Sequence, residues 1–140
     1  MNIFEELSAE HDKVSELLAS LEDSGPDEAT LRTLKSELTA HAEAEEQVFY
    51  KRLEVEDETK DLVAEGYEEH KEIARALGVL NPELGADTFS TALAGLKEIV
   101  EHHVEEEEGT LFAKARPLLS EDEAESLREA FEKAKSQLQS

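Results

Sequence analysis

The chain has 140 residues, a length that fits one domain able to bury a sizeable core. It carries 36 acidic and 14 basic residues, and the resulting formal net charge of -22 makes nucleic acids and anionic membranes poor partners. The absence of cysteine excludes disulfides, iron–sulfur clusters and thiolate zinc sites. Because the chain has no apolar run of about eighteen residues and no N-terminal secretion signal, we expect a cytoplasmic protein that does not enter a membrane.

Most of the chain is predicted to be helical, because apolar residues recur at steps of three and four. This spacing keeps side chains on one face of a helix, whereas a strand needs strict alternation. The fold class is therefore predicted to be all-α. The expected helices span residues 3–22, 26–56, 59–80, 87–116 and 120–138.

The boundaries of these helices follow from turn and capping residues. Residues 54–58 have the weakest periodicity and are expected to form the turn before the third helix. Residues 81–86 contain Asn-Pro and glycine, which predict a loop. Asp87 is expected to cap the fourth helix and Pro117 to end it. Residues 120–123 read as a capping box that opens the last helix.

Polar residues interrupt the apolar faces of the first four helices. Each stands where the helical repeat calls for a buried apolar side chain. A buried ionised glutamate is very costly unless it is paired or coordinates a metal. The six residues are therefore predicted to converge on one cluster that holds cations: His11, His41, Glu45, His70, His103 and Glu107.

The chain also shows a weak internal repeat of two helical hairpins. Each hairpin has one helix with a single histidine and one helix with the pattern His-x-x-x-Glu. This predicts an up-down antiparallel four-helix bundle over about residues 3–116, in which inward side chains of facing helices build the site. An additional C-terminal helix at about 120–138 completes a single domain of residues 1–140. That helix packs across the bundle or makes a dimer contact, and the oligomeric state is left open.

The repeat distinguishes two neighbouring histidines. His103 takes the same register as His41, whereas His102 aligns with Ala40 and lies about 100° further round the helix. His103 is therefore predicted to face inward and His102 to flank the site. Three acidic residues beside the cluster are predicted to be solvated surface charges: Glu46, Glu106 and Glu108.

The number and kind of these side chains point to two metal ions. His-x-x-x-Glu places an imidazole and a carboxylate one turn apart, about 6 Å between Cβ atoms. Four histidines and two glutamates exceed what one tetrahedral zinc needs. They suit two ions with each glutamate bridging, because imidazole binds iron, zinc, copper and nickel while carboxylate adds a negative, bridging ligand.

The pattern resembles the hemerythrin family in its bacterial hemerythrin-like (HHE, cation-binding) form, over about residues 5–116. The resemblance rests on His11, residues 41–46 with Phe49, His70, and residues 103–108 with Leu111-Phe112. It implies an up-down four-helix bundle around a non-haem di-iron centre with an oxo or hydroxo bridge. It further implies that the four histidines are terminal iron ligands and that the two glutamates are bridges.

The chain departs from the oxygen-carrying members of that family. Those members have a fifth histidine one turn from another on the third helix, but Gly66 and Ala74 stand one turn before and after His70. Their second bridging carboxylate is an aspartate at a longer spacing. Both differences place the chain with the divergent HHE proteins. The position of the missing ligand is open to water, His102 or Tyr67.

The leading functional hypothesis is a di-iron protein that binds O2, peroxide or nitric oxide at an open iron position. Its apolar walls are expected to be Val14, Leu18, Phe49, Ile73 and Leu111. The alternatives are an enzyme that decomposes peroxide or reduces nitric oxide, an iron sensor or store, a zinc or manganese site in the same cage, and a metal-free acidic bundle. No general acid or base stands outside the ligand set, so the sequence does not choose between binding and catalysis.

Overall fold

The computed structural model describes all 140 residues, and all of its regular structure is helical, as predicted. Several short segments continue the long helices, so that the chain forms five helical rods. The elements are α1 (Ile3–Ser24), α2 (Glu28–Glu45), η1 (Glu46–Tyr50), α3 (Lys51–Leu53), α4 (Lys60–Val79), α5 (Ala86–Glu106), η2 (Glu107–Leu111), α6 (Phe112–Ala115), η3 (Arg116–Leu118) and α7 (Glu121–Gln139).

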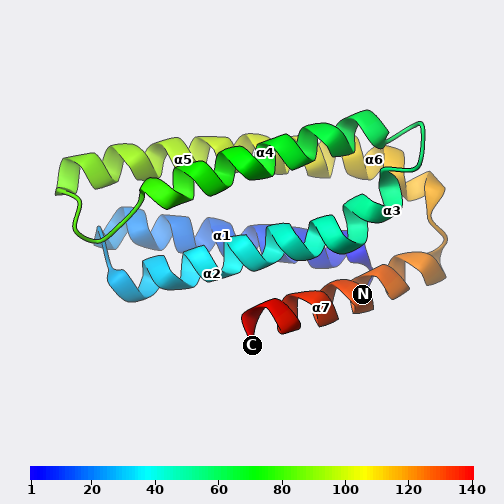
Figure 1. Ribbon diagram of the computed structural model, residues 1–140, viewed down its shortest axis with the longest axis horizontal. Coiled ribbons are helices and arrows are strands. Elements are labelled where there is room, and N and C mark those ends of the chain that lie inside the picture. The colour runs from blue at the N-terminus through cyan, green and yellow to red at the C-terminus, as the bar shows by residue number, and fades with distance from the viewer.

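Four rods lie side by side, and the chain reverses direction at each connection (Figure 1). The pair α1 and α2 forms one layer, and the pair α4 and α5 forms the other. Helix α7 runs back across the outer side of α1 and α2 and packs against both. It thus takes one of the two places expected for it, against its own bundle. None of the helices combines the length and apolar character needed to cross a membrane.

The helix boundaries follow the sequence signals with one correction. The turn at 54–58 is confirmed, since α3 ends at Leu53 and α4 begins at Lys60. Asp87 does not cap α5, because the extended residue before the helix is Gly85 and Asp87 already lies in the first turn. Its charge there still favours the positive end of the helix dipole. The α-helix of the fourth rod ends at Ala115, close to the predicted end before Pro117, and the proline lies in the short 3-10 turn η3 that follows.

Two π-helical turns, η1 and η2, interrupt the second and fourth rods, where continuous α-helix was expected. Turns of this kind are frequent at functional sites. Here the wider turn lets two consecutive side chains face the core, Phe49-Tyr50 in η1 and Leu111-Phe112 at the end of η2. The turn η1 directly follows Glu45 and η2 begins with Glu107, so both turns place bulky side chains beside the predicted cluster.

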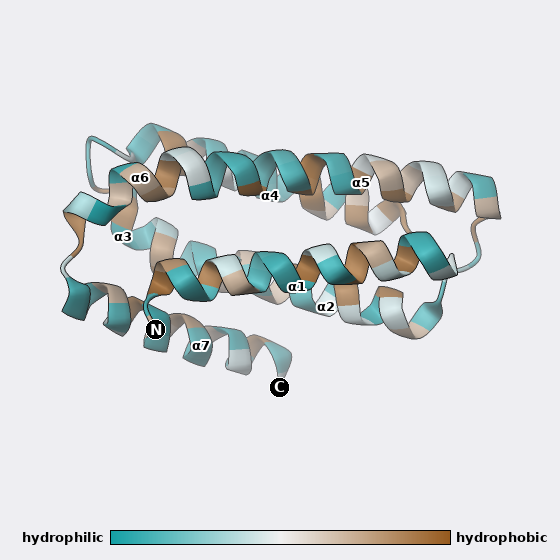
Figure 2. Cartoon of the chain, turned by 180° about the vertical axis from the view of Figure 1, so that it is seen from behind, coloured by the Kyte–Doolittle hydropathy of each residue, from teal (hydrophilic) through white to brown (hydrophobic).

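The apolar core has two parts, one toward each end of the rods. One part is rich in aromatic residues, with Phe4 packed edge-on against Phe49 and Phe112. The other contains the aliphatic residues of the four rods, including Leu34 and Leu96. Figure 2 shows hydrophobic residues on the faces that the rods turn to one another and hydrophilic ones on the outside. The six predicted polar residues lie between the two apolar parts along each rod.

Candidate metal centre

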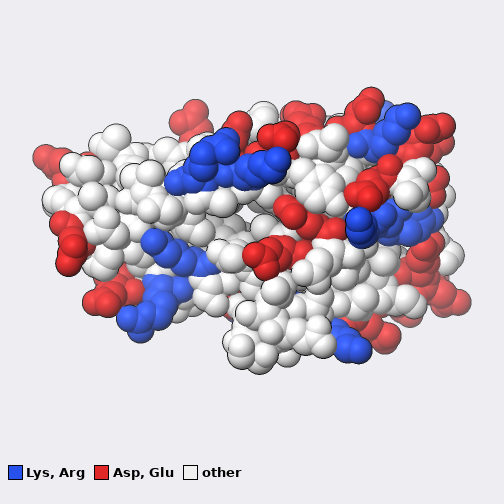
Figure 3. Space-filling model, viewed as in Figure 1, with Lys and Arg blue, Asp and Glu red and all other residues white.

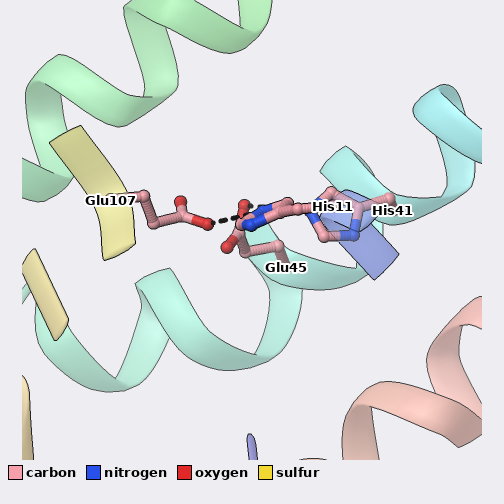
Figure 4. Close-up of side chains that lie close together, drawn as sticks. All are labelled: His11, His41, Glu45 and Glu107. Carbon is pink, nitrogen blue, oxygen red and sulfur yellow. Dashed lines mark ion pairs between the residues drawn. The ribbon is translucent and has the colours of Figure 1, made fainter. Parts of the chain in front are cut away.

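The structure brings all six predicted residues together inside the bundle, each 7% exposed or less. Their ligand atoms form two groups, within which all atoms lie within 4.8 Å of one another. The two groups share both glutamates, so each carboxylate faces both positions. The first group is His11, His41, Glu45 and Glu107, and the second is His70, His103, Glu45 and Glu107 (the first in Figure 4).

The distances between these atoms match those between ligands of one metal ion. The Nε2 atom of His11 lies 3.1 Å from Glu107 Oε1, and the Nε2 atom of His103 lies 3.4 Å from Glu107 Oε2. Glu45 Oε1 lies 3.1 Å from His70 Nε2 and 3.7 Å from His41 Nε2. Two donors about 2.1 Å from a common ion lie roughly 3 to 4 Å apart. Each glutamate therefore approaches one histidine of either group.

The inward atoms of this cluster have no hydrogen-bond partner in the protein. This is true of the Nε2 atoms of all four histidines, of both oxygens of Glu45 and of Glu107 Oε1. A buried polar atom without a partner costs about 1–3 kcal/mol. A self-contained polar network would require these atoms to be satisfied. A pair of cations fits the arrangement, because it would satisfy all of them at once.

Each of the four histidines is held from the outside by a second set of carboxylates. Since an ionised carboxylate only accepts hydrogen bonds, each Nδ1 donates its proton outward, so that in the neutral imidazole Nε2 presents a lone pair inward. This is the tautomer that a metal ligand needs. The pairs of Nδ1 and carboxylate are His11 with Glu108 at 2.6 Å, His41 with Glu10 at 2.9 Å, His70 with Glu46 at 2.7 Å, and His103 with Glu69 at 2.6 Å.

Two residues of this outer set correct the sequence analysis. Glu46 and Glu108 were predicted to be solvated surface charges, but they accept hydrogen bonds from histidines of the opposite hairpin. Each follows a cluster glutamate by one residue, which turns its side chain about 100° toward the neighbouring rod. Glu106, predicted to be solvated as well, is partly exposed and forms no ion pair.

The other two outer carboxylates, Glu10 and Glu69, were not predicted. The signal for them is the doublet Glu-His, which occurs at the same place in both hairpins. A carboxylate next to an inward histidine lies on the flank of the helix, where it reaches the histidine of its partner helix. The internal repeat therefore includes the outer carboxylates as well as the six residues of the inner cluster.

Tyr50 occupies the region beside Gly66, one turn before His70. Its hydroxyl donates a hydrogen bond of 2.7 Å to Glu107 Oε2, and its ring stacks on His70 with 5.1 Å between centroids. A Cβ atom at residue 66 would lie 2.5 Å from the Tyr50 hydroxyl oxygen. Glycine is thus required here to admit the tyrosine. Sequence analysis missed Tyr50 because an aromatic residue in a helix next to the core reads as packing.

The two side chains proposed from the sequence to fill that region lie elsewhere. The Tyr67 hydroxyl donates to Glu54 Oε1 at 2.9 Å, outside the cluster. The side chain of His102 is 64% exposed and lies 3.8 Å from Glu69. His102 thus flanks the site, as the repeat predicted, through an outer carboxylate.

Burial and mutual contact separate the pKa values of the cluster in the metal-free protein. Burial and the nearby Glu107 raise the pKa of Glu45 well above its ordinary value. Burial opposes ionisation of Glu107 too, but contacts with His103 and His11 outweigh it and hold that pKa well below its ordinary value. Desolvation lowers the pKa of His11 and His103, yet their contacts with carboxylates raise it to about 9. Protons therefore supply the positive charge that metal ions would supply.

We predict that metal binding at pH 7 releases protons from His11 and His103, because a ligating imidazole must be neutral, and that Glu45, whose raised pKa favours its protonated form, adds to the release. The pKa of both histidines is raised from 6.5 to about 9, so their protonation contributes to the stability of the metal-free fold. This contribution is fully present below pH 6.5. That stabilisation is lost as the pH rises through 9. Calorimetric metal titration in two buffers of different ionisation enthalpy measures the release. Equal heats in both buffers at pH 7 would contradict the protonated state.

Comparison with known proteins gives the same family as the residue pattern. The family model described as "Hemerythrin HHE cation binding domain" matches residues 2–115. A protein of Nostoc sp. (strain PCC 7120) named "DNA nickase" is 35% identical over 146 aligned positions. The alignment covers 99% of this chain but 40% of that protein, so the chain spans about two fifths of the relative's length. No solved structure gives a significant match. The chain belongs to the hemerythrin HHE cation-binding family.

Proposed function

We propose that this chain is a non-haem di-iron protein that binds O2, peroxide or nitric oxide inside an up-down antiparallel four-helix bundle. The observation that carries the proposal is the sharing of Glu45 and Glu107 between two groups of buried ligand atoms. If only one carboxylate were shared, a single ion with a nearby histidine pair would explain the arrangement. Two shared carboxylates, each with oxygens aimed at both groups, are the arrangement expected of a bridged pair.

In this proposal His11 and His41 would hold one ion, His70 and His103 would hold the other, and both glutamates would serve both ions. Iron in this site would supply the electrons for binding or reducing a small oxidant. The donor set also suits zinc or manganese, and affinity alone does not select iron over zinc. Family membership and the excess of ligands over a tetrahedral set favour iron.

A small apolar cavity adjoins all four histidines. Its volume is about 20 Å³, enough for one water-sized molecule. The expected walls Val14 and Ile73 line it, together with Leu38, Val100 and Val104. An apolar wall disfavours ions and admits small neutral molecules, which supports O2, nitric oxide or hydrogen peroxide as the ligand class.

The other expected wall residues lie apart from this cavity. Phe49 and Leu111 belong to the aromatic-rich part of the core. Leu18 lines a groove between α1 and α5. A smaller space of about 10 Å³ adjoins His103, Glu107 and Leu111 on the aromatic side, so the larger space for a ligand lies on the side that faces the aliphatic part of the core.

A groove of about 220 Å³ between α2 and α4 provides an approach to the cavity. Figure 3 shows the surface hollowed between these two helices. The groove and the cavity share Leu38, Ala42, His70 and Ile73, so these side chains are the partition between them. In this proposal, a small molecule passes from the groove to the cavity by displacing these side chains.

We predict that Tyr50→Phe lowers metal affinity roughly 10-fold, at the low end of the 10–100-fold typical for partners of metal ligands. The substitution removes the donor to Glu107 Oε2 and retains the ring that packs on His70. Tyr67→Phe is the matched control, because its hydroxyl contacts Glu54 outside the cluster. Competition with a chelator measures both variants. Equal affinities of Tyr50→Phe and wild type would show that the phenol does not position Glu107.

The proposed function is tested by exposing the reduced, iron-loaded protein separately to O2, hydrogen peroxide and nitric oxide. We expect a change in the visible spectrum that saturates at one small molecule per centre for at least one of them. No response to any of the three would refute this ligand class. Continuous oxygen evolution from peroxide or continuous consumption of nitric oxide would instead establish the enzymatic alternative. If the occupancy of the centre by iron follows the iron supply, and the centre responds to none of these molecules, iron sensing or storage would be established.

Nicking activity does not enter the proposal for this chain. The name "DNA nickase" belongs to a relative of which the chain covers 40%. The net charge of -22 opposes binding to a polyanion. We propose a cytoplasmic protein whose partner is the small ligand itself.

A further inference from the structure

Helix α7 buries a lysine against the outer side of α1 and α2, at the level of the metal cluster. Lys135 is 9% exposed, and its ammonium group contacts Glu10 Oε2 and, at 2.7 Å, Glu37 Oε2. A buried ammonium group is costly unless carboxylates pair with it. The other oxygen of Glu10 accepts the hydrogen bond from His41 Nδ1 at 2.9 Å. One continuous set of contacts therefore runs from α7 through Glu10 to His41.

This connection distinguishes His41 from the other three histidines. Glu46 and Glu108 each contact a histidine and no lysine or arginine. Glu69 contacts His103 and has only the exposed His102 nearby, at 3.8 Å. Glu10 is thus the one outer carboxylate that a buried cation holds in place.

A second side chain of α7 reaches the same histidine. The Phe131 ring, one turn before Lys135, packs edge-on against the His41 ring with 5.7 Å between centroids. Phe131 is fully buried. The imidazole is therefore fixed by α7 both at its face and, through Glu10, at its Nδ1 atom. Residue 131 and residue 135 both lie outside the segment matched by the family model, which ends at 115.

We propose that Lys135 is a positioning residue, which holds Glu10 and through it His41 for the first metal position. The fifth helix then supports the position of His11 and His41 and leaves the position of His70 and His103 unaffected. Without the ammonium group, the Glu10 carboxylate is free to turn toward water, and His41 loses the partner that fixes its tautomer. The inference rests on the metal centre of the proposed function, but it requires neither iron nor the small ligand.

The test is Lys135→Met in the full chain, with zinc as the probe and two-site affinities measured by chelator competition. We expect one of the two sites to weaken about 10–100-fold and the other to stay unchanged within about twofold. Lys135→Arg retains the positive charge and should recover most of the loss. Lys13→Met is the matched control, because Lys13 contacts Glu37 at 3.1 Å without contacting Glu10. In a His41→Ala background, Lys135→Met should no longer change zinc affinity.

Three results would overturn the inference. Wild-type affinity of Lys135→Met at both sites would show that the contact does not position His41. An equal loss at both sites with a lower unfolding midpoint would show that Lys135 only supports the fold. Should Lys135→Met fail to fold, Glu10→Gln takes its place, since it keeps the lysine. This variant must show the same loss at one site. Full zinc affinity of Glu10→Gln at both sites refutes the proposal. Absence of zinc and iron binding in the wild type would instead refute the metal centre itself.

Discussion

Replacing Glu45 with glutamine will leave the protein unable to hold two ions. Glu45 is fully buried and belongs to both groups of ligand atoms, so its charge is lost from both positions at once. We expect the affinity to fall more than about 100-fold, beyond the 10–100-fold typical for outer partners of metal ligands. Metal stoichiometry and chelator competition measure the loss. Glu43→Gln is the control, since Glu43 is an exposed carboxylate on the same helix.

The same substitution should not weaken the metal-free protein. Burial raises the pKa of Glu45, which means that the folded state disfavours its charge. A carboxyl whose pKa is raised on folding reduces stability once the pH exceeds its unfolded value, and glutamine has no such charge. The unfolding free energy of metal-free Glu45→Gln at pH 7 should equal or exceed that of metal-free wild type. A clear loss would show that the carboxylate serves the fold rather than a metal.

Removal of metal from the wild type will lower its stability substantially. An ion held at a hundred times its dissociation constant adds about 2.7 kcal/mol, so two ions add about 5 kcal/mol. For a chain of this size, this corresponds to a fall in the unfolding midpoint of roughly 10–20 °C. The loss should be reversed by a metal that accepts imidazole ligands and not by calcium, which prefers oxygen ligands alone.

Calorimetric unfolding with and without chelator, followed by metal replacement, checks this result. An unchanged midpoint after complete metal removal would mean that the buried cluster is satisfied without ions. Restoration by calcium to the same extent would mean that the stabilising site lies among surface carboxylates.

The inner cluster could be predicted because it breaks a strong pattern. Histidine or glutamate at a position that the helical repeat reserves for apolar residues is visible without coordinates, as at His41 and Glu45. The choice of His103 over His102 likewise followed from register alone, and the structure buries the first and exposes the second. Periodicity also fixed the five helices, with ends within a few residues.

The outer contacts could not be predicted because they depend on how the helices pack. Glu108 lies at a position that an isolated helix would expose, and only the neighbouring rod turns it into a partner of His11. Lys135 reads as a charged residue on a polar face, yet it is buried because α7 crosses Glu10 and Glu37. Tyr50 reaches Glu107 by virtue of the π-helical turn η1 and the missing side chain at Gly66. The sequence shows the glycine, but it shows neither the π-helical turn nor the approach of Tyr50 to residue 66.

The most direct test of the account is the iron content of protein purified and reconstituted under anaerobic conditions, followed by a visible spectrum after exposure to air. The two groups of ligands sharing Glu45 and Glu107 predict about two irons per chain and oxo–iron absorption that appears with air. The Glu45→Gln protein should show neither. Wild-type protein that retains almost no iron and stays colourless after careful reconstitution would contradict the di-iron centre.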